Sequence, residues 1–424
     1  MTVVTALPKY ESYKDSEVQW IGEVPEHWEV QKLKHLFYEK KHTQNMELSC
    51  GSISFGKVVY KNDEKVPLAT KASYQEVLKE EFLINPLNLN YDLISLRIAL
   101  SKINVVVSAG YIVLKDKVSL NREYFKYLLH RYDVAFMKLL GSGVRQTINF
   151  NHISNSLLAF PPFPEQTAIA NFLDEKTKKI DEAIAIKEKQ IELLKERKQI
   201  IIQKAITQGL NPNVPMKDSG IDWIGEIPEH WECLANRVLL KERKEPGRDD
   251  LPLLSVSIHS GVSSEEVSEE DNIRGRIKIE DKSKYQLVKP NDIAFNMMRA
   301  WQGGIGAVKV TGMVSPAYII AKPLKDMNSS FFELQYRCPE FIQQMDRYSK
   351  GITDFRKRLY WDGFKQLITI LPPKEEQDSI VSYVDKENAI TEKLISSQVQ
   401  QIEKLKEYKS TLINSAVTGK IKVV

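Results

Sequence analysis

The sequence has few cysteines and no long apolar segment. Its 424 residues contain three cysteines, Cys50, Cys233 and Cys338, which stand far apart. This spacing excludes a paired zinc-ligand motif, and the odd number argues against a disulfide framework. No run of about 18 uncharged apolar residues occurs, and residues 1–10 lack the basic and apolar regions of a secretion signal. We therefore expect a cytoplasmic protein without membrane partners.

The sequence also lacks a strong excess of either charge. Its 60 Lys and Arg residues against 56 Asp and Glu residues leave a formal net charge of +4. Such a small excess allows nucleic-acid binding without arguing for it, because the placement of the charges decides. Hydrophobic residues make up 42% and charged residues 27%, as in soluble globular proteins. The length allows two or three domains, each with its own core.

The motifs of common catalytic sites are missing as well. The glycines of Gly141–Gly143 and Gly303–Gly306 lack the Lys-Ser/Thr ending of a phosphate-binding loop. Pro161–Pro162 and Pro372–Pro373 follow Phe and Leu, so neither pair has the asparagine of an amino-methyltransferase loop. No cluster of carboxylates with a nearby lysine predicts the metal ion of a nuclease. We expect no catalytic residue and no metal ligand.

What the sequence does contain is a tandem duplication. Trp20–Glu29, which reads Trp-Ile-Gly-Glu-Val-Pro-Glu-His-Trp-Glu, returns with one change as Trp223–Glu232, at an offset of 203 residues from Trp20 to Trp223. Pro161–Gln166 returns as Pro372–Gln377 at an offset of 211, from Pro161 to Pro372. The second offset then continues without a gap to the end of each copy. Each half is therefore a variable globular stretch followed by a segment of constant length.

The segments of constant length are predicted to be long helices. Neither 166–208 nor 377–418 contains glycine or proline, and each would extend about 65 Å. Apolar residues recur at heptad spacing, which predicts that the two helices pair with each other as a coiled coil. Polar positions in this seam, namely Thr177, Lys187, Asn388 and Gln398, are expected to fix its register. The predicted apolar seam comprises Leu173, Ile180, Ile184, Ile191, Leu194, Ile201, Val384, Ile395, Ile402, Leu405 and Leu412.

The first helix has a wider apolar stripe than the second. Ile186, Leu193 and Ile200 correspond to Ser397, Lys404 and Thr411 at the 211 offset. One interpretation is packing against a globular domain of this chain. The other is a docking face for another subunit.

The order globule, helix, globule, helix suits a reader of duplex DNA. The duplex has a local two-fold axis, so two related domains that read it alike must face in opposite senses, which makes their helices antiparallel. The repeated Trp-Ile-Gly-Glu-x-Pro-Glu-His-Trp motif, the Pro-Pro-x-x-Glu-Gln helix start and the Ala-x-Thr end at 205–207 and 416–418 resemble the specificity subunits of type I restriction-modification enzymes over nearly the whole chain.

The resemblance implies an α+β fold. Two globular target recognition domains, at 1–163 and 211–373, would be separated by helical regions at 164–210 and 374–424. The helices would form an antiparallel coiled coil with pseudo-two-fold symmetry.

The resemblance also implies a non-catalytic DNA-specificity subunit that reads an asymmetric bipartite site. Its partners would be double-stranded DNA, two modification subunits that methylate adenine, and restriction subunits that translocate and cut. This subunit would hold no cofactor, while the others would use S-adenosylmethionine, ATP and Mg²⁺. The alternatives are a duplicated protein-binding scaffold without DNA specificity, and an enzyme in which recognition is fused to catalysis.

Candidate DNA contacts are Arg, Lys, Asn and Gln side chains in the variable stretches. Each could equally be a surface ion pair or a solvated charge. Arg145 and Arg356 correspond at the 211 offset, which favours a phosphate contact common to both halves. The predicted set comprises Arg97, Arg145, Gln146, Asn149, Arg299, Gln302, Arg356, Lys357 and Arg358.

The paired tryptophans at 20, 28, 223 and 231 have two interpretations. They could stack on flipped bases, or they could pack in the cores of the two halves. Because they recur in both halves, we expect core packing. His27 and His230 lie in the same repeated motif and are not expected to be ligands.

Overall fold

The computed structural model describes residues 8–87, 96–137, 148–221, 224–248, 250–258, 260–263, 284–351 and 357–423. The chain forms two compact units. The first unit comprises Met1–Lys187 and Val399–Val424, and the second comprises Glu188–Gln398. Each unit therefore contains part of both long helices. The domain boundaries predicted from the sequence stay predictions.

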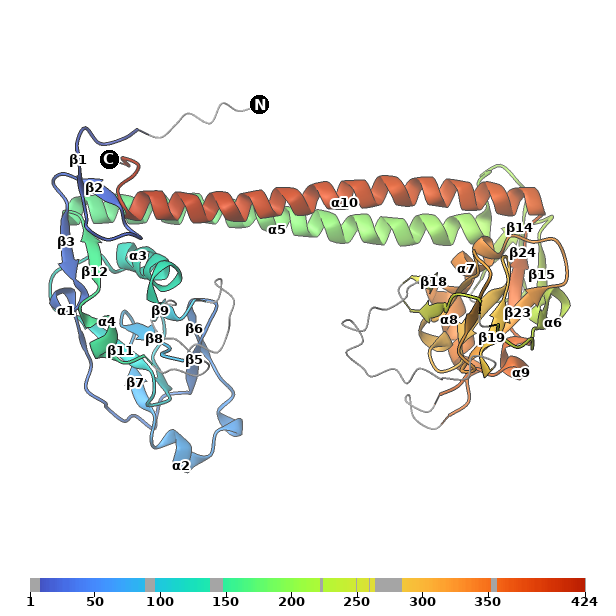
Figure 1. The fold of residues 1–424 in the computed structure, drawn as a ribbon, viewed down its shortest axis with the longest axis horizontal. Helices are drawn as coiled ribbons and strands as arrows, with labels where there is room; N and C mark the ends of the chain where they lie inside the picture. Colours follow the sequence, from blue (N-terminus) through green and yellow to red (C-terminus); the bar gives the residue numbers. More distant parts are fainter. Residues whose placement is uncertain are drawn as a thin grey trace. The chain divides into compact units, whose positions relative to one another are not determined.

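The first unit contains a mixed set of short strands and helices, followed by the start of a long helix (Figure 1). Its strands are β1 (Tyr13–Asp15), β2 (Glu23–Pro25), β3 (Glu29–Lys32), β4 (Phe37–Glu39), β5 (Gly51–Ser54), β6 (Lys57–Tyr60), β7 (Gln75–Val77), β8 (Phe82–Ile84), β9 (Ile98–Leu100), β10 (Val105–Val107), β11 (Ile112–Asp116) and β12 (Leu157–Phe160). Its helices are α1 (Leu33–Leu36), η1 (Asp63–Lys65), α2 (Leu68–Lys71), α3 (Arg122–Ala135), α4 (Phe150–Ser154) and the first part of α5 (Phe163–Gln208).

The second unit repeats this order of strands. Its strands are β13 (Met216–Asp218), β14 (Glu226–Pro228), β15 (Glu232–Ala235), β16 (Leu240–Glu242), β17 (Ser255–Ser257), β18 (Gly261–Ser263), β19 (Gln286–Val288), β20 (Ile293–Asn296), β21 (Ile305–Ala307), β22 (Gly312–Val314), β23 (Tyr318–Pro323) and β24 (Ile368–Leu371). Its helices are α6 (Asn236–Leu239), η5 (Ala300–Gln302), α7 (Ser329–Tyr336), α8 (Pro339–Arg347), α9 (Trp361–Phe364) and the first part of α10 (Lys374–Val417).

Each unit contains its own four-stranded antiparallel sheet, and the two sheets have equivalent strand orders. The strand order is β4-β11-β8-β9 in the first unit and β16-β23-β20-β21 in the second. In the first unit α3 lies between the sheet and the start of α5 (Figure 1), and its buried Tyr124, Phe125 and Leu128 join the main core. The corresponding α7 buries Phe331 and Phe332. The predicted α+β class is confirmed, and the duplication extends to the strand order.

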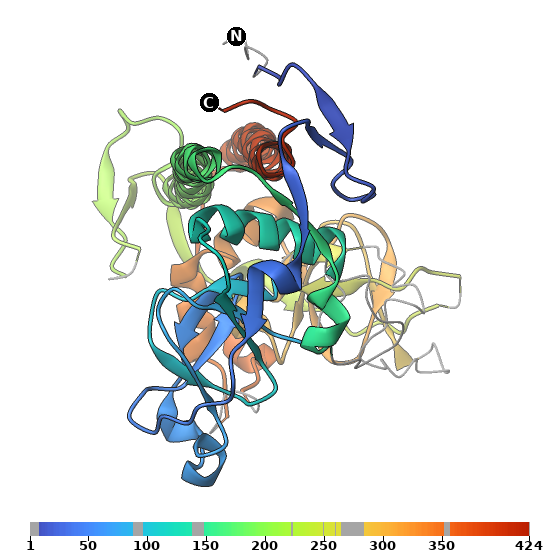
Figure 2. The same cartoon turned by 90° about the vertical axis from the view of Figure 1, so that its left-hand side faces the viewer.

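Within the first unit the two long helices run antiparallel. Asp181 accepts a hydrogen bond from Lys409 at 2.7 Å, and Lys187 donates to Gln401 at 2.6 Å. Residue numbers therefore fall along α10 as they rise along α5. Leu173 and Leu412 are buried in the same core. The pair is seen end-on in Figure 2. The predicted antiparallel pairing is therefore confirmed for this part of the helices.

Within the second unit the same two helices pair in the same way. Ala205 and Ile206, near the end of α5, share a core with Ile380 and Val384, near the start of α10. Lys198 donates to Glu392 at 2.8 Å. This ion pair is the duplicate, at the 211 offset, of the pair between Lys409 and Asp181 in the first unit.

These seam ion pairs lie at the edge of the helix interface. The Asp181 and Glu392 side chains are largely exposed. Each pair therefore adds about 0–1 kcal/mol to stability, and its larger effect is on the orientation and register of the helices.

The remaining seam residues are buried to different degrees. Ile180 and Ile402 are buried, and Leu405 and Ile184 pack at the edge of the first core. Ile191, Leu194, Ile201 and Ile395 are half-buried.

The residues of the second apolar stripe of α5 are largely exposed. Ile186, Leu193 and Ile200 are 61%, 50% and 45% exposed. Ile200 also borders a pocket with Cys338 and Phe341 of the second unit, so the two interpretations of this stripe stay open.

Candidate nucleic-acid interface

The two repeated motifs meet at the start of each long helix. In the first unit the Glu165 carboxylate accepts hydrogen bonds from Trp28 Nε1 at 3.0 Å and from the Tyr10 hydroxyl at 2.8 Å, and it lies 2.6 Å from His27 Nε2. We call these four residues the first junction. Burial by itself would raise the pKa of Glu165, but the hydrogen bonds from His27, Trp28 and Tyr10 outweigh burial and lower it. Trp28 is fully buried, so it cannot stack on DNA.

The second unit has the same arrangement. Glu376 accepts from Trp231 Nε1 at 3.0 Å and lies 2.6 Å from His230 Nε2, and these three residues form the second junction. Trp231 is also fully buried, which agrees with core packing. Trp20 is half-buried beside Tyr132. Trp223 lies outside the described residues.

The glutamine that follows each junction glutamate anchors the recognition domain. Gln166 accepts a hydrogen bond from the Asn121 backbone N–H at 2.8 Å, and Gln377 accepts from Asn328 at 2.8 Å. Asn121 and Asn328 in turn cap the starts of α3 and α7. The sequence predicted a helix start at this motif but no contact for its glutamate or glutamine. The signal for one was the Glu-Gln pair repeated at the 211 offset.

Arg97, one of the predicted DNA contacts, is buried in the structure. Its side chain is only 7% exposed, and its Nε donates to the fully buried Asp133 at 3.1 Å. The two terminal guanidinium nitrogens are buried and make no hydrogen bond among the described residues. Arg97 lies immediately before β9, and its side chain points into the domain. This burial favours a structural role.

His130 on α3 is expected to make the stability of the first unit depend on pH. Its Nε2 is buried without a hydrogen-bond partner among the described residues, and burial lowers its pKa to about 4. The unfolded chain binds the proton at a pKa of about 6.5. The stability that the neutral ring contributes is therefore complete above pH of about 6.5 and is lost as the pH falls towards 4, by up to about 3 kcal/mol.

We expect His130→Gln to flatten the dependence of the unfolding free energy on pH in this range. Chemical unfolding at several pH values checks this. Parallel curves for the two proteins would contradict the assignment. His42→Gln, at an exposed histidine of the same unit, is the control.

The predicted contacts of the second unit converge on one surface. Arg299 donates to Gln302 at 2.8 Å at the two ends of the η5 turn. Lys357, more than 50 residues later, places its ammonium 5.2 Å from the centre of the Trp301 ring and 2.7 Å from Asp346. Arg358 follows directly and pairs through its backbone with Lys350. We call Arg299, Gln302, Lys357 and Arg358 the basic patch. Two Arg, one Lys and one Gln beside an indole ring form a surface that can hold phosphate and base edges.

The other predicted DNA contacts do not belong to the basic patch. Asn149 is exposed, but its side chain accepts from the His152 backbone in the capping box of α4. Arg145, Gln146 and Arg356 lie outside the described residues. The equivalence of Arg145 and Arg356 stays a prediction.

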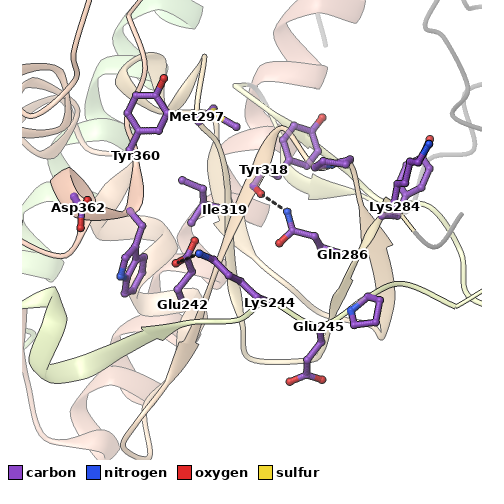
Figure 3. Close-up of a pocket in the computed structure, with 14 residues that line it drawn as sticks. Glu242, Lys244, Glu245, Lys284, Gln286, Met297, Tyr318, Ile319, Tyr360 and Asp362 are labelled. Atoms are coloured by element: carbon purple, nitrogen blue, oxygen red, sulfur yellow. Dashed lines mark hydrogen bonds and ion pairs between the residues drawn. The ribbon is translucent and has the colours of Figure 1, made fainter. Parts of the chain in front are cut away.

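A groove of about 640 Å³ opens beside β16 and β23 of the second unit (Figure 3). Three carboxylates, those of Glu242, Glu245 and Asp362, line it against two lysines. This balance disfavours a phosphate backbone. The bond from Gln286 Nε2 to the Tyr318 carbonyl, 3.1 Å long, has a counterpart in the first unit between Gln75 and Tyr111. The contact therefore belongs to the shared fold.

Other kinds of site find no support in the described part of the chain. It contains no group of three or more His, Cys, Asp or Glu side chains that could hold a metal ion. Its three cysteines are unpaired. None of its helices has a stretch apolar and long enough to span a bilayer.

Comparison with known proteins shows which family this chain resembles. Residues 25–196 match the model of the type I restriction modification DNA specificity domain. A putative type I restriction enzyme MjaX specificity subunit from Methanocaldococcus jannaschii is 24% identical over 462 residues, covering both chains completely. This chain is therefore similar to type I restriction-modification specificity subunits over its whole length. The resemblance seen in the sequence is confirmed.

Further similar proteins have the same description. The type I restriction enzyme EcoBI specificity subunit of Escherichia coli is 23% identical, over 71% of this chain and 66% of the relative. One similar solved structure comes from a study of complex assembly and conformational transition of the type I R-M system. Its TM-score is 0.65 at 14% identity, and the match covers 93% of this chain and 98% of that chain. The HsdS subunit of Thermoanaerobacter tengcongensis has a TM-score of 0.53 at 13% identity, covering 96% and 100%. These two structures share the fold of the specificity subunit.

Proposed function

We propose that this specificity subunit reads an asymmetric, bipartite site in duplex DNA, one half-site with each unit. One observation carries the proposal: the two units attach to the long helices through equivalent junctions, yet their exposed residues differ. The second unit presents the basic patch beside Trp301, and the globular stretches of the two units share little sequence outside the repeated motifs. A protein that reads two different half-sites in opposite orientations needs two units that attach to the helices in the same way but carry different DNA-facing side chains.

The subunit acts without catalysis of its own and assembles with enzymes. The exposed stripe of Ile186, Leu193 and Ile200 supports a docking face for them, since an open apolar row on a helix suits a partner surface. We propose two modification subunits and the restriction subunits as partners. S-adenosylmethionine, ATP and Mg²⁺ would bind to those subunits and not to this one. The cytoplasm is the proposed location.

Selection from a random duplex pool tests this function. The full chain, alone and with its modification subunits, is expected to enrich one asymmetric sequence with a constant gap between two specified halves. Loss of adenine methylation at that sequence in a host without the protein is the matching result in the cell. A duplicated protein-binding scaffold would enrich no sequence, and that outcome would overturn the proposal.

The paired helices are proposed to set the gap between half-sites. We expect four residues inserted in α5 after Lys187, together with four in α10 after Gln398, to lengthen the preferred gap by about two base pairs. Four helical residues add about 6 Å, and a base pair about 3.4 Å. These insertion points lie where the two compact units divide, so the pairing within each unit is kept.

The bases of the two half-sites should stay the same after the insertion. Selection of bound sequences from the random pool measures both properties. An unchanged gap would show that the helices do not set the spacing. Insertion in α5 alone is the control, and it should weaken binding because it shifts the register of the helix pair.

A further inference from the structure

The tip of the β5–β6 hairpin carries an unusual side chain. Phe55 is 83% exposed, the highest value among the exposed large apolar side chains of the described residues. Full exposure of a phenyl ring forfeits the favourable transfer of its surface out of water. Packing within the first unit therefore does not explain a phenylalanine at this position.

The backbone at this position also disfavours phenylalanine. Ser54 pairs with Lys57, so the two-residue turn consists of Phe55 and Gly56. Their φ angles are +46° and +70°, as in a type I′ turn. Such turns favour Asn-Gly, because asparagine tolerates the left-handed conformation and a bulky residue does not. Phe55 is thus disfavoured both by its conformation and by its exposure, and such an outlier points to a function.

The turn is held firmly against the rest of the unit. Gly56 is buried, and a Cβ added there would lie 2.8 Å from Leu96 Cδ1 and 3.2 Å from His130 Nε2. This close approach seats the turn on α3 and on the residues before β9. The ring of Phe55 is therefore presented outwards by a fixed backbone, which lowers the entropy lost when it binds.

The segment that carries the ring is rich in lysine. Lys57, Lys61 and Lys65 are exposed, and no ion pair is formed by them among the described residues. Residues 51–71 contain four lysines against one Asp and one Glu. An apolar ring at the tip of a lysine-rich hairpin, with Lys57 next to the turn, fits the duplex, whose phosphates flank stacked bases, better than it fits an apolar protein groove.

The second unit has no such ring in the corresponding hairpin. β17–β18 occupies the equivalent place, since parallel bridges link Cys50 to Val106 and Leu253 to Met313 in the two units. Its connecting residues 258–260 contain no Phe, Tyr or Trp. The feature is therefore specific to one half of the molecule, as a determinant of one half-site would be.

We propose that Phe55 is a wedge that enters the duplex at a base-pair step of the first half-site and stacks on a base. This rests on the proposed DNA-reading function. Apolar side chains that insert between base pairs unstack and kink the duplex. Pyrimidine–purine steps open most easily, so the first half-site should contain such a step beneath Phe55.

Phe55→Asn separates the wedge from a structural role. It creates the favoured Asn-Gly turn, so the thermal unfolding midpoint should stay the same or rise. Affinity for the selected duplex should fall about tenfold to a hundredfold, in the range seen for loss of one stacked base. Phe55→Trp should keep the affinity, because indole also stacks. Leu68→Asn, at a 76% exposed apolar residue of the same unit, is the matched control and should change neither property.

The measurement uses the full chain with its modification subunits and the duplex that the wild-type protein selects. 2-Aminopurine placed at successive positions of the first half-site should brighten at one step with the wild type and not with Phe55→Asn. Equal affinity of the two proteins, or a lower unfolding midpoint for Phe55→Asn, overturns the wedge. So does unchanged DNA affinity with lost binding of modification subunits, which would assign Phe55 to a protein interface. If the wild type selects no sequence, the proposed function itself fails.

Discussion

Asp133→Ala is expected to lower the free energy of unfolding of the first unit by about 3–5 kcal/mol, since it leaves a buried guanidinium without its partner. The Asp133 side chain is fully buried, and that of Arg97 is 7% exposed. Asp133 also accepts a hydrogen bond from the Arg97 backbone N–H. Denaturant unfolding followed by tryptophan fluorescence measures the loss.

Two variants sharpen this expectation. Arg97→Met combined with Asp133→Leu replaces the ion pair by apolar side chains and should restore much of the stability, because neither charge is then left buried. Arg122→Ala removes an ion pair with Asp116 whose arginine is 44% exposed, and should cost at most about 1 kcal/mol. If the double variant kept full stability but lost DNA affinity at one base, Arg97 would be a DNA contact after all.

Trp28→Ala and Trp231→Ala are expected to destabilise their units to a similar degree, by about 3–5 kcal/mol each. Both indoles are fully buried and donate to the junction glutamate at 3.0 Å. Each substitution leaves a large cavity and removes a hydrogen bond from a carboxylate. Limited proteolysis and denaturant unfolding of the two variants measure the effect.

The junction histidines provide the control. His27→Ala and His230→Ala remove rings that are about half exposed, at 48% and 43%, so losses below about 1 kcal/mol are expected. Trp28→Phe fills most of the space and should keep the selected DNA sequence unchanged. A change of sequence preference in Trp28→Phe without loss of stability would show that the indole reads DNA.

Long-range repetition made much of this fold predictable. The 211-residue offset covers both helices, and the heptad positions within it were enough to predict their pairing. The direction of the pairing followed from DNA symmetry, and the contacts of Asp181 with Lys409 agree with it. The four repeated tryptophans were expected in the core because they occur in both halves, and two of them, Trp28 and Trp231, are fully buried.

Individual DNA contacts were harder to predict. Arg97 and Arg299 both lie near strand ends and look alike in the sequence, yet one is buried and the other exposed. A local pattern does not reveal where an arginine points, since that depends on a partner such as Asp133, 36 residues away. Phe55 was missed because a Phe-Gly turn does not match the usual Asn-Gly signal.

The sequence by itself determined the duplication, the two long helices and their mutual seam, because periodicity is a local property that survives divergence. Only the tertiary structure decided which side chains are available to a ligand. It buried Arg97, brought Lys357 over Trp301, left Ile186, Leu193 and Ile200 open and turned Phe55 outwards. Exposure depends on contacts between residues far apart in the chain, and no spacing along the chain records those contacts.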